Sequence, residues 1–87
     1  MKLLVRNKVK DAGRWKRIFD EQGEAGRAYG LAAENVWQSA DAPDEVWFVF
    51  DVEDRARAEA YMALPESAEV GERAGVIEGE AIFLETL

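Results

Sequence analysis

Hydrophobic residues along the chain change their spacing several times, and the changes divide the sequence into strands and helices. Residues 2–9 alternate loosely and end in a β-branched valine, which predicts a strand. Residues 31–40 and 45–52 predict two further strands, joined by a turn at Asp41–Asp44 in which a proline fixes φ. Residues 76–87 predict the last strand. The middle two strands should therefore form a hairpin.

The segment after Asp11 has the helical period. Asp11 is a suitable N-cap because its carboxylate can accept hydrogen bonds from free amides of the first turn. The helix should end at Gly30, which suits the left-handed position after a helix. Gly23 and Gly26 lie inside it, which favours a close approach of this helix to the sheet. The residues of the apolar stripe are Trp15, Ile18, Phe19, Gln22, Gly26 and Tyr29.

An alanine-rich segment, residues 53–64, predicts a second helix. Either Asp51 or Asp54 can cap its first turn, since both carboxylates precede the segment. Pro65 either ends this helix or opens a further helical turn through Ala74.

The predicted order is β-α-β-β-α-β over residues 1–87, without a linker or repeat, so we expect a single domain. Split β-α-β units of this kind form a four-stranded antiparallel sheet with both helices on one face. The sequence therefore predicts an α+β protein with the ferredoxin-like arrangement.

Both faces of the predicted strands are apolar. Along residues 45–52 the two sets of alternate positions both carry large hydrophobic side chains, Val46, Phe48, Phe50 and Val52 in one set and Trp47 and Val49 in the other. Two helices cover one face only, and an antiparallel face turned to water is normally polar. A second copy of the chain is the simplest cover for an apolar patch of this kind. We expect a homodimer in which two sheets pack face to face around a central cavity.

Composition and charge exclude several kinds of site. Hydrophobic residues make up 48% and charged residues 33% of the chain, as in soluble globular proteins. The absence of cysteine and histidine excludes thiol chemistry, serine–histidine catalysis and the usual zinc sites.

Residues 1–17 carry a net charge of +6 and the remainder −13. We interpret the basic end as a solvated strand and helix face, because the central strand lacks the Lys/Arg-Gly lead of an RNA-recognition motif. Nucleic acid and membrane are not expected as partners. Nothing resembles a targeting segment, so a cytoplasmic location is expected.

Several short runs resemble one known family over nearly the whole chain: Asn7–Asp11, Trp15 with Phe19, Ala28–Leu31, Asp41–Val46, Arg73–Val76 and Ile82–Glu85. On these runs the chain is similar to small dimeric α+β barrel proteins of the antibiotic-biosynthesis-monooxygenase-like and polyketide-cyclase-like group. Relatives often carry histidine where this chain has Asn7, so the chain departs from the family there and lacks the imidazole that an inherited acid–base role would need.

A cavity between two such sheets would be lined by the strand faces that no helix covers. Its expected ligand-binding residues are Asn7, Asn35, Trp37, Trp47 and Asp51. Strand parity decides between Arg6 and Asn7, and the loose alternation of the first strand leaves that choice open. The two tryptophans can stack on an aromatic ligand or pack at a dimer interface. Asp51 can act as a general base or as a helix cap.

Arg27 and Tyr29 lie at the end of the first predicted helix, where they could reach the mouth of a cavity and bind an anionic substrate. For Arg27, a position on the surface is preferred. The resemblance implies a small enzyme, working without cofactor or metal, that oxygenates or cyclises an aromatic or polyketide-like molecule. The alternative is a non-catalytic dimer that binds a ligand or serves a structural role.

Overall fold

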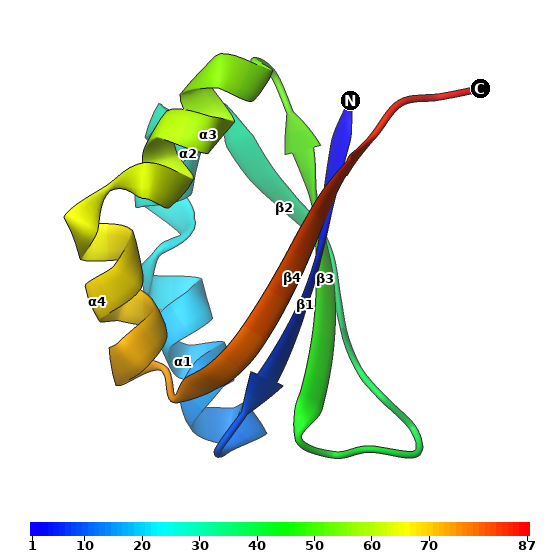
Figure 1. The fold of residues 1–87 in the computed structure, drawn as a ribbon, viewed down its shortest axis with the longest axis vertical. Coiled ribbons are helices and arrows are strands. Elements are labelled where there is room, and N and C mark those ends of the chain that lie inside the picture. The colour runs from blue at the N-terminus through cyan, green and yellow to red at the C-terminus, as the bar shows by residue number, and fades with distance from the viewer.

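Four antiparallel strands form one sheet in the order β2-β3-β1-β4, and the helices lie together on one face of it (Figure 1). The computed structural model describes residues 1–87. Its strands are β1 (Lys2–Val9), β2 (Leu31–Gln38), β3 (Glu45–Val52) and β4 (Val76–Leu84). The predicted ferredoxin-like α+β fold is confirmed. The first and third strands have the predicted bounds, whereas the second and fourth end earlier, at Gln38 and Leu84.

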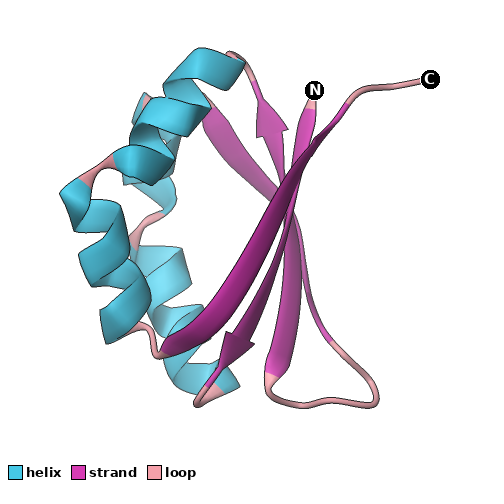
Figure 2. Ribbon diagram, in the orientation of Figure 1, coloured by secondary structure: helices cyan, strands magenta, loops and turns pink.

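The first predicted helix is divided into two, and Pro65 opens a separate helix after the second, which confirms one of the two alternatives for that proline (Figure 2). The helices are α1 (Ala12–Glu21), α2 (Gly23–Ala28), α3 (Arg55–Ala63) and α4 (Pro65–Arg73). The expectation of one continuous helix up to Gly30 was therefore wrong. The first break falls at Gln22, which keeps a near-helical φ of −87°. The second falls at Leu64, where extended backbone precedes the proline that opens α4.

The helix ends have the capping residues that the sequence predicted, except at Asp51. The carboxylate of Asp11 accepts from the amides of Gly13 at 2.9 Å and Arg14 at 3.2 Å. Gly30 ends the first helical segment with a φ of +77°, in the region that favours glycine. Asp54 caps α3, so the alternative that placed Asp51 at this position was wrong.

The core lies between the sheet and the helices in two clusters. One contains Val9, Trp15, Val46, Phe48 and Ala74, and the other contains Leu3, Leu31, Val52 and Ala58. Only 11 of the 87 residues are buried. A core this small leaves apolar surface on both sides of the sheet, which directs attention to the space under the helices and to the uncovered face.

Strand register assigns each residue of β1 to one face. Opposite Phe50 and Phe48 on β3 lie Leu3 and Val5, on the face that the helices cover. Asn7 follows on the same side, by the alternation of a strand. We call this side the helix face and the other the open face.

Candidate functional site

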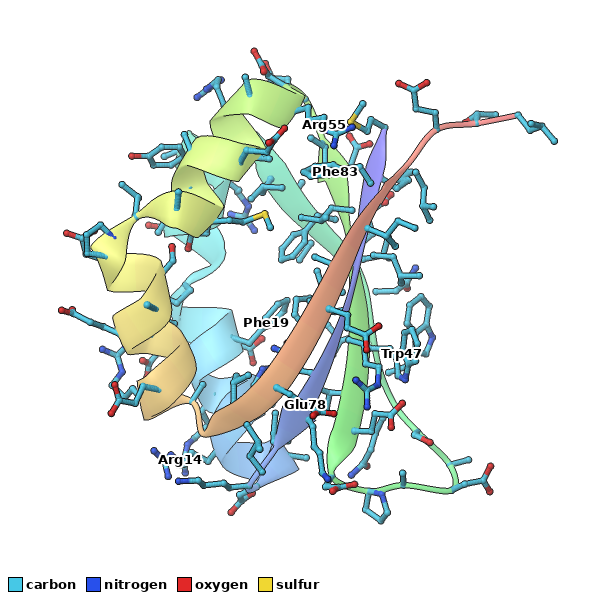
Figure 3. All side chains as sticks on the ribbon, viewed as in Figure 1. Arg14, Phe19, Trp47, Arg55, Glu78 and Phe83 are labelled. Carbon is cyan, nitrogen blue, oxygen red and sulfur yellow. The ribbon has the colours of Figure 1, made fainter.

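A cavity of about 380 Å³ lies between the helices and the helix face of the sheet. Sixteen of its 23 lining residues are hydrophobic. Sites for small molecules are mostly apolar and typically about 300–1,000 Å³ in volume. Figure 3 shows Phe19 directed from α1 into the space between this helix and the sheet. The cavity is within a single chain, in addition to any space that two sheets would enclose.

One wall of the cavity is aromatic. Trp15 and Phe19 on α1 stack with ring centroids 4.9 Å apart, and Phe48 on β3 lies 5.1 Å from each of them. Phe50 continues the wall, 5.6 Å from Phe48. These separations are typical of favourable aromatic pairs. A planar aromatic ligand would find stacking partners here at both a helix and a strand.

Small residues form much of the helical wall. A Cβ atom added at Gly23 on α2 or at Gly71 on α4 would meet nothing within 4 Å. Gly26 differs, because its added Cβ would lie 3.5 Å from the carbonyl oxygen of Leu31. The predicted close approach to the sheet therefore holds at Gly26 and is wrong at Gly23. Neither Gly23 nor Gly71 has a positive φ, so the backbone does not require glycine at these two positions.

Five polar side chains line the otherwise apolar cavity: Asn7 on β1, Gln22 at the first helix break, Arg27 on α2, Tyr61 on α3 and Ser67 on α4. The Ser67 hydroxyl donates to the backbone carbonyl of Tyr61, whereas the other four side chains take part in none of the side-chain hydrogen bonds or ion pairs of the chain. No carboxylate lines the cavity. The site can therefore donate hydrogen bonds and stabilise negative charge, but it contains no carboxylate or imidazole base.

The phenol of Tyr61 is held in its neutral form. Burial raises its pKa above the ordinary value of 10.0, and the nearby phenol of Tyr29 raises it further. The two rings lie 5.2 Å apart. At neutral pH the Tyr61 hydroxyl is accordingly available to donate a hydrogen bond.

Two hydrogen bonds tie the helices to one another around the cavity. The guanidinium of Arg57 on α3 donates to the carbonyl of Ala28, and that of Arg14 on α1 donates to the carbonyl of Arg73 at 2.8 Å. Between these ties the two helix breaks flank an outer recess. The recess shares four lining residues with the cavity: Gln22, Tyr61, Ser67 and Val70. The recess is thus the natural mouth of the cavity.

Strand parity separates the residues predicted as one site. Asn7 lies on the helix face and lines the cavity. Trp37 pairs with Trp47 on the open face, and Trp37 is 51% exposed. Asn35, opposite Val49, lies on the open face as well, because a register irregularity interrupts the alternation of β2. Asp51 is exposed there and accepts from the amine of Lys2 at 3.3 Å. For the open-face residues, a ligand between two sheets stays a prediction.

The choice between Arg6 and Asn7 is also settled by parity. Arg6 lies on the open face opposite Trp47 and contacts the carboxylates of Glu45 at 3.1 Å, Glu78 at 3.3 Å and Glu80 at 3.4 Å. The hydrogen bond from Arg6 lowers the pKa of Glu45, and the bond from the Trp47 indole lowers it further. Trp47 and Glu78 carry labels in Figure 3, with Trp47 directed away from the helices.

Sequence analysis did not single out Tyr61 or Gly71. For Gly71 the signal is helical spacing: Ser67 and Gly71 in α4 and Ala74 directly after it recur on one side of the helix, and all three line the cavity. This pattern of small residues is visible in the sequence, but it is interpretable only once the facing sheet residues are known.

Comparison with solved structures identifies the architecture. One structure named an antibiotic biosynthesis monooxygenase has a TM-score of 0.71 at 16% identity, covering 99% of this chain and 97% of that one. SnoaB, a cofactor-independent oxygenase from Streptomyces nogalater, also has a TM-score of 0.71, at 13% identity and 99% and 93% coverage. The chain has the antibiotic-biosynthesis-monooxygenase fold. The family resemblance noted in the sequence is confirmed for the fold.

The antibiotic-biosynthesis-monooxygenase fold does not by itself specify an activity. An uncharacterized NIPSNAP domain protein from Burkholderia xenovorans has a TM-score of 0.66 at 16% identity, with 100% of this chain and 95% of that one covered. Neither a family model nor a curated protein matches the sequence. No helix has the length and hydrophobicity needed to span a membrane.

Proposed function

We propose that this protein is a homodimeric, cofactor-free oxygenase of aromatic, polyketide-like small molecules, which bind in the cavity under the helices. The observation that carries the proposal is the combination of an aromatic wall with unpaired polar groups in a cavity of about 380 Å³. The shared fold with a cofactor-independent oxygenase supports the reaction class. A cytoplasmic location is part of the same proposal.

The chemistry requires an electron-rich substrate, because oxygen must receive electrons from the substrate itself. A tricyclic anthrone illustrates the balance: its CH₂ group and O₂ give a C=O group and one water. Loss of a proton from the CH₂ forms an enolate, which reduces O₂. Asn7 can donate an amide hydrogen bond to the enolate oxygen, and water at the mouth accepts the proton. Donors aimed at developing negative charge typically contribute about 100- to 1,000-fold in rate.

The homodimer is proposed on the open face. Trp37, Ile82 and Leu84 are about half exposed there, and no helix covers them. The ion pairs of Arg6 and of Lys2 surround them with charge. Apolar centres with polar rims are typical of protein interfaces.

The test is oxygen uptake with anthrone, using Asn7→Ala and the matched control Asn35→Ala. Both variants remove an amide, but only Asn7 lines the cavity. We expect kcat to fall about 100-fold in Asn7→Ala and to be unchanged in Asn35→Ala. Equal losses in both variants, or no uptake by the wild-type protein with any polycyclic phenol or anthrone, would refute the oxygenase.

A non-catalytic ligand-binding dimer is the second candidate. Its specific support is the lack of any carboxylate or imidazole in the cavity. Binding of the same aromatic compounds without oxygen uptake would favour this function.

A further inference from the structure

The distribution of charge around the cavity is the opposite of that in the whole chain. The chain has 18 acidic and 11 basic side chains. None of the acidic side chains lines the cavity, and Arg27 is the single basic residue that does. Arg27 would repel a cation in the cavity, and a neutral ligand would offer no charge to pair with the Arg27 guanidinium.

Arg27 lies on the side of α2 that lines the cavity. Gly23, Gly26 and Arg27 follow the i, i+3, i+4 spacing of one helix side, and all three line the cavity. The Arg27 side chain is exposed and forms no ion pair, although Glu24 lies one turn before it on the same helix. Four of the eleven basic side chains, Lys2, Arg6, Lys16 and Arg55, pair with carboxylates; among those that do not, Arg27 is the one that lines the cavity. The Arg27 guanidinium is thus free to meet a ligand.

We infer that the ligand of this cavity is a monoanion, an aromatic ring system carrying one carboxylate that Arg27 binds. The inference deepens the proposed function, since it takes the same cavity as the ligand site. A guanidinium suits a planar carboxylate because it offers paired N–H donors in matching geometry.

Arg27 and Asn7 lie toward opposite ends of the cavity. Arg27 follows Gly26, which packs on Leu31 opposite Val52 at one end of β3. Asn7 pairs with Val46 near the other end of β3. The carboxylate is therefore held away from the amide that faces the reacting ring, and Arg27 contributes equally to binding the substrate and the transition state. Its loss should raise KM and leave kcat nearly unchanged.

The experiment compares 2-naphthoate with its neutral isostere 2-naphthamide by titration calorimetry at low ionic strength. We expect the wild-type protein to bind 2-naphthoate about tenfold more tightly than the amide, the effect of one hydrogen bond to a charged group. Arg27→Gln should abolish this preference. Arg17→Gln is the control, since it removes the same charge from α1 at an exposed residue that does not line the cavity.

The outcomes separate this inference from the proposed function. Equal affinities for both compounds in the wild-type protein, or an unchanged preference in Arg27→Gln, would overturn the monoanion inference alone. If neither compound binds, the cavity does not accept aromatic ligands and both proposals fail. A naphthoate preference that depends on Arg27, without oxygen uptake, would support the monoanion and reject the oxygenase.

Discussion

Gly71 offers a substitution that should stabilise the protein and weaken ligand binding. It lies in α4, has an ordinary helical backbone, and lines the cavity, where an added Cβ would meet nothing within 4 Å. A helical glycine without such a backbone requirement destabilises by about 0.5–1 kcal/mol relative to alanine. Gly71→Ala should recover that amount, which raises Tm by about 3–6 °C in a chain of this size.

Gly71→Leu tests whether the space is a cavity that the protein keeps open. Three carbons beyond alanine would bury against the lining, contributing up to about 2.4 kcal/mol at 0.8 kcal/mol per carbon. Ordering the leucine side chain costs about 0.5–1 kcal/mol, so a net gain of up to about 1.4–1.9 kcal/mol remains. The leucine would occupy space that a ligand needs, and we expect affinity for 2-naphthamide to fall at least about tenfold.

The measurements are thermal unfolding at fixed protein concentration, because dimerisation would make Tm concentration-dependent, and calorimetric binding. Gly71→Ala is the matched control: it changes the helix propensity but adds one methyl group, so binding should be nearly unchanged. Gly23→Leu fills the cavity from α2, and its effect on stability should be non-additive with Gly71→Leu because both compete for one volume. A destabilised Gly71→Leu, or a stable one that binds the ligand as tightly as the wild-type protein, would contradict the assignment of this cavity as the ligand site.

Three further variants probe other parts of the structure. Ile82→Glu, at a 55% exposed residue of the open face, should halve the mass measured by light scattering while the chain stays folded by circular dichroism; an unchanged dimer would place the interface elsewhere. Gly79→Ala would bring a Cβ within 2.7 Å of Oδ1 of Asn7, so it should displace that amide and lower oxygen uptake with little change in Tm; full activity would argue against a role for the amide. Glu45 has a lowered pKa because Arg6 donates to it, so its contribution to stability is present above its ordinary pKa, near 4.5, and is lost as pH falls below that value. Glu45→Gln should therefore flatten the acid side of the Tm profile, and an identical profile in the variant would exclude this ion pair as a source of acid lability.

The strand framework was predictable because its signals are local. Glu45–Val52 is a continuous run of β-branched and aromatic residues bounded by turn residues, and its bounds agree with β3. Pro65 marked the second helix break, but the first was not predictable from periodicity, because Gln22 keeps a near-helical φ and the apolar stripe continues across it. Helical spacing survives a break of this kind, so a single segment and two successive ones produce the same pattern.

The cavity could not be located from the sequence, because it depends on how far the helices stand from the sheet. Sequence reasoning found the uncovered face and therefore placed a cavity between two sheets. It could not choose between Arg6 and Asn7, since apolar residues occur at both parities of β1, as at Leu4 and Val5. Pairing with β3 resolves that choice.

Two adjacent residues of β1 therefore have different proposed roles, Arg6 in the dimer interface and Asn7 in the ligand cavity. Arg6 holds Glu45 beside Trp47 on the open face, where the second copy is proposed to bind. Asn7 presents its amide to the cavity on the helix face. The sheet separates this cavity from the open face, so we expect ligand binding not to depend on the partner proposed there. A folded monomeric Ile82→Glu protein should therefore still bind 2-naphthoate with unchanged affinity, and loss of binding on dissociation would show that the dimer shapes the cavity through β1.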